Sequence, residues 1–268
     1  MIRDITLGQY FPGESVVHRL DARTKIILST LYIIEIFVVN NFIGFIITAA
    51  GLAAVVAISR VPLNFIFRGL KVIFLIIILT FFINLFMVDG RVLFHWKFLT
   101  VTYEGLYRAI FMAVRLVMLI IGTSMLTLTT KPIELTDGLE KLLSPFSRIG
   151  VPSHEIALMM TIALRFIPTL LDETDKIMKA QQARGADFES GNIMQRAKSL
   201  IPILIPLFIS SFRIAQELAL AMESRCYHGG SGRTRMKTMS FGRTDLKAAI
   251  VAIIYFTAII ASRFIKIR

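Results

Sequence analysis

The stretch GLKVIFLIIILTFFINLFMV, from Gly69 to Val88, is almost wholly apolar and carries a single charge, at Lys71. A helix rises about 1.5 Å per residue, so about 20 such residues cross the roughly 30 Å hydrocarbon core of a bilayer. Four more stretches share this character: Ile26–Asn40, Phe42–Ile58, Leu106–Leu128 and Ala248–Ala261. The sequence therefore predicts an all-α, polytopic membrane protein with about five transmembrane helices.

The overall composition supports the same class. Hydrophobic residues make up 55% of the 268 residues and charged residues 18%, whereas soluble domains are about a quarter charged. The 30 Lys and Arg exceed the 18 Asp and Glu, which gives a formal net charge of +12. These basic residues punctuate apolar runs, a pattern typical of a membrane protein with a basic cytoplasmic side and not of a nucleic-acid binder. The single Cys226 excludes a disulfide framework and a cysteine-based zinc site.

The basic clusters also predict an orientation. One lies before the first span, between Arg19 and Lys25, and another lies between the second and third spans, from Arg60 to Lys71. The turn at Asn40-Asn41 carries no charge. Because basic loops stay in the cytoplasm, we expect the N-terminus there. Residues 1–24 lack the apolar core of a cleaved signal, so we expect the first span to be retained.

After the fourth span the pattern changes to amphipathic helices with charges of both signs. We divide the chain into residues 1–128 with four spans, a cytoplasmic module at 129–246, and a final span at 247–268. The module is predicted to contain long helices, at Ile156–Gln182, interrupted near Arg165 and Pro168, and at Leu200–Glu223. A short helix at Thr136–Leu143 precedes them, and a polar loop at Gly229–Arg243 follows. An alternative count of seven spans places Leu158–Leu171 and Leu200–Ile209 across the membrane.

Enzyme signatures are missing from the sequence. There is no G-x-x-x-x-G-K-[ST] motif, so the chain has no P-loop with which to hydrolyse ATP. His154-Glu155 lacks the second histidine of a zinc protease, and the four histidines are scattered. The sequence therefore predicts a non-catalytic chain with no cofactor or metal of its own.

A weak internal repeat marks the ends of the two long helices. Arg184 and Arg225 each lie between two small residues at a predicted helix C-terminus. Superimposing the two arginines aligns Ala180 with Ala221, Ala183 with Ser224, and Gly185 with Cys226. Small neighbours let another protein approach the backbone closely, and a guanidinium offers five donors to carboxylates or helix carbonyls. The alternative for each arginine alone is that it complements the helix dipole, worth about 0.3–1 kcal/mol.

Five motifs together resemble the T component of energy-coupling factor (ECF) transporters, over nearly the whole chain. They are Gly8–Ser15 (GQYFPGES), His18–Lys25 (HRLDARTK), Leu164–Pro168 (LRFIP), Ala180–Gly185 (AQQARG) and Ala221–Tyr227 (AMESRCY). Two positions depart from the family pattern: Ala22 stands where proline is common, and Cys226 where glycine is common. Neither departure changes the two arginines, although Cys226 has less backbone freedom than glycine.

The resemblance implies a scaffold subunit of an ABC-type importer for vitamins or metal ions. Such a scaffold binds two cytoplasmic ABC ATPase subunits, which hold ATP and magnesium, and a membrane-embedded S component, which holds the substrate. By matching position, the ATPase-docking residues are expected to be Ala183, Arg184, Gly185, Ser224, Arg225 and Cys226.

Two further sets of residues are candidates from their chemistry. One set of apolar residues either forms an adaptable platform for the S component or belongs to plain helix core or lipid contacts. The set is Met159, Met160, Phe166, Ile201, Leu204, Ile205 and Phe208. Glu35 and Arg115 lie within predicted spans, where charges are costly, so we expect them to form an ion pair. Pro202 and Pro206 either kink their helix or mark its first turns.

Two rival functions are weighed against the scaffold. A stand-alone secondary transporter is expected to have repeated spans and a midplane site, and no repeat is evident among the spans. A membrane-bound enzyme is expected to gather nucleophiles, acids or metal ligands, and none converge in the sequence.

Overall fold

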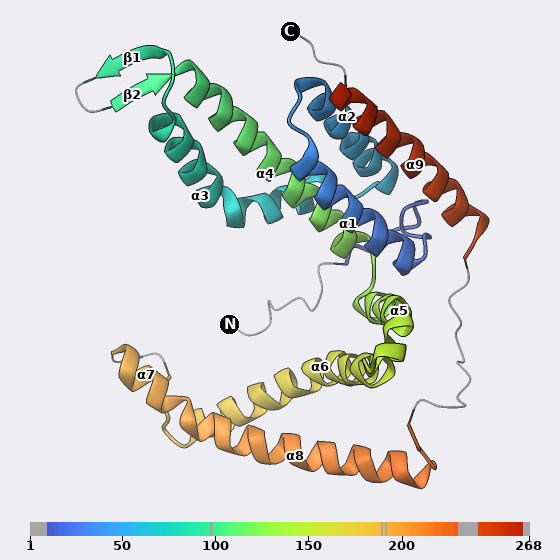
Figure 1. The fold of residues 1–268 in the computed structure, drawn as a ribbon. Coiled ribbons are helices and arrows are strands. Elements are labelled where there is room, and N and C mark those ends of the chain that lie inside the picture. Colours follow the sequence, from blue (N-terminus) through green and yellow to red (C-terminus); the bar gives the residue numbers. More distant parts are fainter. Residues whose placement is uncertain (1–9, 97–98, 189, 191, 230–240, 265–268) are drawn as a thin grey trace. The chain divides into compact units, whose positions relative to one another are not determined.

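The structure, a computed structural model, describes residues 10–96, 99–188, 190, 192–229 and 241–264. Gly8 and Gln9 of the opening motif, and residues 230–240 of the predicted loop, lie outside these ranges. Helices dominate the described residues, which confirms the predicted all-α class (Figure 1). The chain divides into two compact units. We call residues 8–138 with 239–268 the bundle unit, and residues 139–238 the helix-pair unit.

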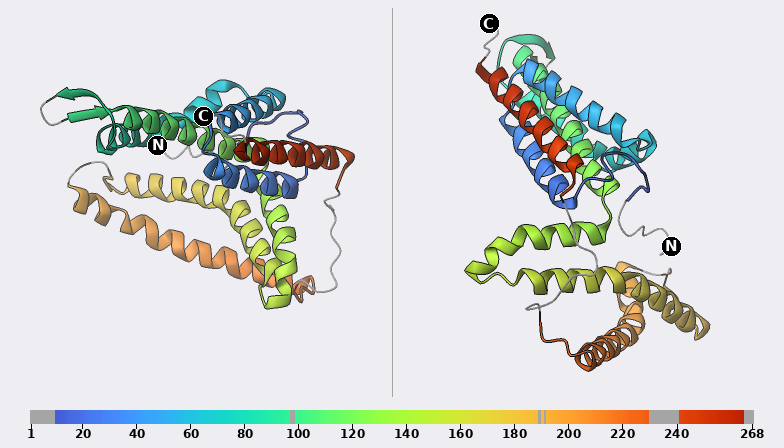
Figure 2. Two further views of the ribbon diagram at one scale, coloured as in Figure 1. Left: turned by 45° about the horizontal axis from the view of Figure 1, so that its top comes forward. Right: turned by 90° about the vertical axis from the view of Figure 1, so that its right-hand side faces the viewer.

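The bundle unit consists of long apolar helices that pack side by side. They are α1 (Ala22–Val38), α2 (Phe42–Ser59), α3 (Leu63–Met87), α4 (Tyr103–Thr129) and α9 (Arg243–Phe264). In it α4 packs against both α3 and α1, and α9 packs against α2, as Figure 2 shows from two sides. Its main core cluster contains Ile36, Val39, Phe45, Leu52, Met118 and Ile259.

Three of the predicted spans are confirmed by length and composition. α2, α4 and α9 are each long and apolar enough to cross a membrane. α3 is long and apolar enough if its two parts, which are bent by 60° relative to each other, are taken as one span. α1 has 17 residues, the fewest of these five helices, and does not meet this criterion of length and composition.

The seven-span alternative has a structural basis as well. α6 (Ser153–Ala183) and the segment Met194–Glu223 also meet the test of length and composition. However, five charged residues lie in α6 between Asp172 and Lys179. Because charges within hydrocarbon are costly, this half of α6 is poorly suited to a lipid-facing span. The five-span count stays a prediction.

The connection between α3 and α4 contains a hairpin that the sequence did not predict. β1 (Val92–Trp96) pairs antiparallel with β2 (Leu99–Thr102), with Val92 opposite Thr102 and His95 opposite Thr100. Thr102 then caps α4, because its hydroxyl accepts a hydrogen bond from the amide of Gly105 at 3.0 Å.

The predicted ion pair between Glu35 and Arg115 is wrong. A carboxylate oxygen of Glu35 accepts hydrogen bonds from the hydroxyls of Thr48 on α2 (2.9 Å) and Tyr255 on α9 (3.0 Å). The Arg115 guanidinium donates instead to the Val39 carbonyl, at 2.6 Å. α1 ends at Val38, where helix carbonyls lack intrahelical donors, so the arginine serves as a C-terminal cap. The charge pattern alone did not indicate these neutral partners.

The helix-pair unit is built around α6 and α8 (Ile201–Ser224), with α7 (Ile193–Ser199) between them. α5 (Pro132–Leu143), which begins one turn before the predicted Thr136, and the short 3₁₀ helix η2 (Ser144–Ile149) lead into α6. α6 is not interrupted at Arg165 or Pro168 as predicted, and α7 was not predicted.

α6 and α8 run antiparallel. Gln181, near the end of α6, donates to the Pro202 carbonyl at the start of α8, at 3.3 Å. Further along the pair, Ser210 of α8 donates to Glu173 of α6, at 3.4 Å. The C-terminus of each helix therefore lies beside the N-terminal part of the other, as the left view of Figure 2 shows.

Candidate functional site

The end of α6 is a tight, hydrogen-bonded turn around Arg184. Arg184 is the C-cap residue, with φ −89° and ψ 6°. Gly185 follows with a left-handed φ of +87°, and its amide donates to the Gln182 carbonyl at 2.9 Å. The Ala186 amide donates to the Gln181 carbonyl at 3.0 Å. This pair of bonds is a Schellman motif, which closes a helix by satisfying its last carbonyls.

The end of α8 has the same geometry around Arg225. Its φ is −92° and its ψ is 13°. Cys226 adopts a left-handed φ of +56°, and its amide donates to Glu223 at 2.8 Å. The Tyr227 amide donates to Met222 at 3.1 Å. The alignment of Gly185 with Cys226 in the sequence repeat thus corresponds to a shared backbone conformation.

All six residues of the two small-Arg-small segments are exposed. A Cβ added at Gly185 meets no atom within 4 Å, so the surface beside Arg184 is open. Among the described residues, neither the Arg184 nor the Arg225 side chain forms an ion pair or a side-chain hydrogen bond. Both guanidinium groups are therefore available to an external partner.

The antiparallel arrangement places the two arginines at opposite ends of the helix pair. Gln181, beside Arg184, contacts the first turn of α8, whereas Arg225 ends that helix. The 24 residues of α8 correspond to a length of about 36 Å. Two similar sites about this far apart suit two separate partner subunits better than one small ligand.

Gln181 has a structural role that the sequence reasoning missed. Pro206 lies inside α8 and has no amide hydrogen, so it cannot donate to the Pro202 carbonyl one turn earlier. The Gln181 side chain of α6 supplies the missing donor. Two prolines four residues apart were the available signal, because the second always leaves the carbonyl of the first without its helical donor. This bond joins the end that carries Arg184 to the start of α8.

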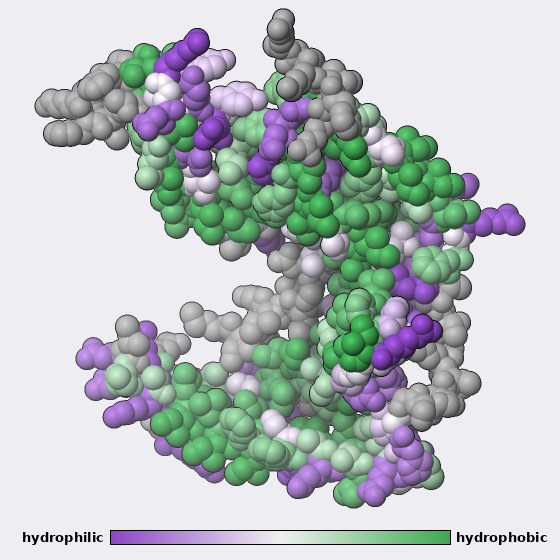
Figure 3. Space-filling view, viewed as in Figure 1, coloured by the Kyte–Doolittle hydropathy of each residue, from purple (hydrophilic) through white to green (hydrophobic). Residues whose placement is uncertain are grey.

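The predicted platform residues do not form one compact patch. Leu204, Ile205 and Phe208 are exposed on α8. Their spacing, which continues through Ile201, Ile209 and Phe212, places them along one stripe of the helix. Figure 3 shows apolar side chains gathered over this part of α8. Met159 and Met160 are also exposed but lie on the first turns of α6, at the opposite end of the pair, and Phe166 is half-buried.

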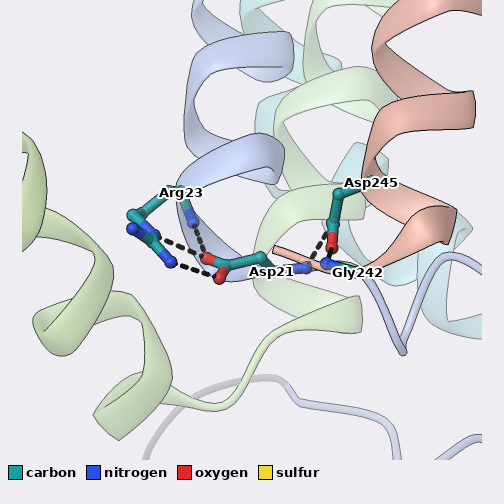
Figure 4. Close-up of polar contacts among 4 residues, drawn as sticks. All are labelled: Asp21, Arg23, Gly242 and Asp245. Carbon is teal, nitrogen blue, oxygen red and sulfur yellow. Dashed lines mark hydrogen bonds and ion pairs between the residues drawn. The ribbon is translucent and has the colours of Figure 1, made fainter. Parts of the chain in front are cut away.

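In the bundle unit, the motif His18–Lys25 forms a polar clamp, shown in Figure 4. Asp245 is buried, and one of its oxygens accepts from the Gly242 amide at 2.8 Å, which closes the N-terminus of α9. Its other oxygen accepts from the Asp21 amide, also at 2.8 Å. The Asp21 side chain in turn caps α1 and accepts two bonds from the Arg23 guanidinium, at 3.1 and 2.8 Å. One carboxylate thus joins the starts of the first and last helices.

The clamp also changes the acidity of Asp21. Burial alone raises the pKa of this carboxyl. Hydrogen bonds from the Arg23 side chain and the Arg23 amide, together with the positive charge of the guanidinium, outweigh burial and lower the pKa below the ordinary aspartate value. Asp21 is therefore held ionised at neutral pH. Its distant partner Asp245 was not predictable from the sequence pattern.

A metal site is not apparent in the part of the chain that the structure describes. No group of three or more His, Cys, Asp or Glu side chains there is arranged to hold a metal ion. The described residues place two exposed guanidinium groups at the hydrogen-bonded ends of α6 and α8, with an apolar stripe along α8 between them.

Comparison with known proteins gives matches over most of the chain. The family described as cobalt transport protein matches residues 13–237. The chain is similar to an energy-coupling factor transporter transmembrane protein of Clostridium kluyveri, with 60% identity over 265 residues that cover 98% of both chains. Proteins of the same name from Thermosediminibacter oceani and Bacillus subtilis are 58% and 46% identical, over 98% and 97% of this chain and 100% and 98% of theirs.

Proposed function

Since the chain belongs to the cobalt transport protein family, we propose that it is the membrane scaffold that couples two ATPase subunits to an S component. The matches confirm the family resemblance carried by its motifs, and the chain is a multi-pass membrane component of an energy-coupling factor transporter. In the proposed role it is not an enzyme. ATP and magnesium bind to the partner ATPases, since the sequence contains no P-loop motif.

The observation that carries the proposal is the matched pair of helix ends. Arg184 and Arg225 cap α6 and α8 with the same backbone geometry and are exposed at opposite ends of the helix pair. Each would engage one ATPase subunit through carboxylates, which a guanidinium binds with two parallel hydrogen bonds, or through helix carbonyls, each of which accepts a single bond. A helix transmits a displacement along its length, so closure of the ATPases on ATP would move these ends and the surface between them.

The proposed orientation places the N-terminus and the helix-pair unit in the cytoplasm. The basic residues around Arg19–Lys25 and Arg60–Lys71 support this orientation by the positive-inside rule. Cytoplasmic ATPases would then reach both arginines.

The S component would rest on the apolar stripe of α8. Leu204, Ile205 and Phe208 belong to this stripe, and Phe208 stacks on Phe212 with ring centroids 6.4 Å apart. Exposed apolar area of this kind favours a hydrophobic partner. Met159 and Met160 lie too far along the pair to belong to the same contact. Substrate choice, vitamin or metal ion, would reside in the S component.

The experiment that tests the proposal replaces both arginines. In membranes that contain the whole transporter, Arg184→Gln with Arg225→Gln should abolish copurification of the ATPases and substrate uptake. Arg213→Gln is the matched control, because Arg213 is an exposed arginine of α8 away from both ends. Full uptake with retained ATPases in the double variant would falsify the docking assignment.

A further inference from the structure

A cavity of about 530 Å³ opens beside Arg225, inside the helix-pair unit. Its walls come from the first half of α6, the last turns of α8 and the residues that follow α8. The apolar part of the lining includes Leu158, Ile162, Leu218 and Met222.

The charged part of the lining has one sign. Arg165 of α6 and Arg225 of α8 both line the cavity, together with His228, and among the described residues no Asp or Glu does. Arg165 is exposed, and among the described residues its side chain forms no ion pair or side-chain hydrogen bond. Two cations that share a cavity without a counter-charge favour an anion that enters from outside.

We propose that this cavity receives an acidic side chain carried on an apolar segment of one ATPase subunit, and that Arg165 binds it together with Arg225. The inference deepens the proposed function and rests on it, because it adds a residue and a partner chemistry to the docking site at the end of α8. The carboxylate would accept hydrogen bonds from the two guanidinium groups, and the apolar flanks of the segment would contact Leu158 and Ile162.

The chemistry of the cavity favours a protein segment over a free phosphate or a lipid headgroup. A phosphate would use the arginines but leave the apolar wall in contact with water. Arg165 and Arg225 also belong to the unit that we place in the cytoplasm.

The cavity makes the two ends of the helix pair unequal. Three residues after Arg225 comes His228, a lining residue, whereas the matching position after Arg184 is Asp187. Arg165 gives the α8 end a second guanidinium in the same cavity as Arg225. An acidic partner segment is preferred where two guanidinium groups share one cavity, so the two ends would discriminate between two non-identical ATPase subunits.

The test uses the whole transporter complex in membranes and two readouts. The first is ATPase retention during salt washes, compared among Arg165→Gln, Arg165→Lys and the control Arg213→Gln. We expect Arg165→Gln to weaken retention about tenfold and Arg165→Lys to weaken it less, because lysine keeps the charge but not the fork. The second readout places a photo-crosslinking amino acid at His228, with Leu220, exposed on α8 outside the cavity, as the control position.

A crosslink from His228 to one ATPase subunit, absent from Leu220, supports the proposal. Unchanged retention in Arg165→Gln, or a crosslink from His228 only to lipid or to the S component, overturns it. The Arg184 and Arg225 double variant distinguishes a failure of the proposed function from a failure of the cavity inference. If that variant keeps its ATPases, the proposed function fails; if it loses them while Arg165→Gln does not, only the cavity inference fails.

Discussion

The two units differ in how their helix ends are completed. At the starts of α1 and α9, Asp21, Arg23 and Asp245 bind one another and the local backbone. At the ends of α6 and α8, backbone Schellman bonds close the helices, and Arg184 and Arg225 remain exposed. An arginine side chain thus binds groups of its own chain in the bundle unit, whereas the two arginines in the helix-pair unit remain exposed.

This contrast distinguishes a structural arginine from a docking arginine. Arg23 pairs with Asp21 at 2.8 Å and lies over the ring of Phe241, with Cζ 4.1 Å from the ring centroid. Its side chain is largely buried, at 16% exposure. Arg184 and Arg225 have no such partners among the described residues. Replacing the first kind should lower stability, and replacing the second should lower assembly.

The largest stability effect is expected for Asp245→Ala. The change leaves the amides of Gly242 and Asp21 without acceptors at two helix starts. Buried unsatisfied donors cost about 1–3 kcal/mol each, so we expect a loss of about 3 kcal/mol. Thermal unfolding of the purified protein in detergent measures it. Asp172→Ala, an exposed aspartate of α6, is the control; equal unfolding temperatures for the two variants would contradict the role of the clamp.

The next effect separates Arg23 from the two exposed arginines. Arg23→Gln should lower stability by roughly 2 kcal/mol, because it leaves the largely buried Asp21 carboxylate unpaired. Arg184→Gln and Arg225→Gln should change stability by only about 0.5 kcal/mol, as is usual for surface sites. Thermal unfolding again measures all three variants. A large loss in Arg184→Gln would mean that this arginine is structural.

The pH dependence of the Arg23 effect has a defined sign. The pKa of Asp21 is lowered in the folded chain, so its ionised form contributes stability above the ordinary aspartate pKa of about 4. That contribution is lost as the pH falls through the lowered value. The difference in unfolding temperature between the wild type and Arg23→Gln should therefore shrink below about pH 4.

The sequence predicted the features that depend on local pattern. Apolar length predicted α2, α4 and α9, and the repeat around Arg184 and Arg225 placed both at helix C-termini. Both signals lie within a few adjacent turns of one helix, where periodicity and capping preferences apply.

Pairings across the chain were not predictable in the same way. Asp21 and Asp245 are 224 residues apart, and any acid near a helix start could have filled the role of Asp245. Glu35 and Arg115 were paired by charge, but hydroxyl and carbonyl groups proved to be their partners. The cavity at Arg165 depends on the antiparallel register of α6 and α8. The residue pattern of a single helix carries no information about that register.

A smaller effect compares the residues that follow the two exposed arginines. Gly185 and Cys226 share a left-handed φ, which glycine adopts freely and other residues adopt at a cost of about 1 kcal/mol. We expect Gly185→Ala to destabilise its helix end by about 1 kcal/mol and Cys226→Gly to stabilise the other by a similar amount. Hydrogen exchange of the last turns of α6 and α8 measures each change. Effects of the same sign would mean that the two ends are not equivalent turns.

The smallest effect tests the link between the Arg184 end and α8. Gln181→Leu removes the only side-chain donor to the Pro202 carbonyl found in the described chain, and should cost about 0.5 kcal/mol because the bond is exposed. In a Pro206→Ala background the alanine amide can make the helical bond to that carbonyl, so Gln181→Leu should then cost much less. A double-mutant cycle on unfolding temperature measures the coupling. If Gln181→Leu lowers stability equally in both backgrounds, Gln181 acts through some other contact, and its bond to the Pro202 carbonyl does not join the end of α6 to α8.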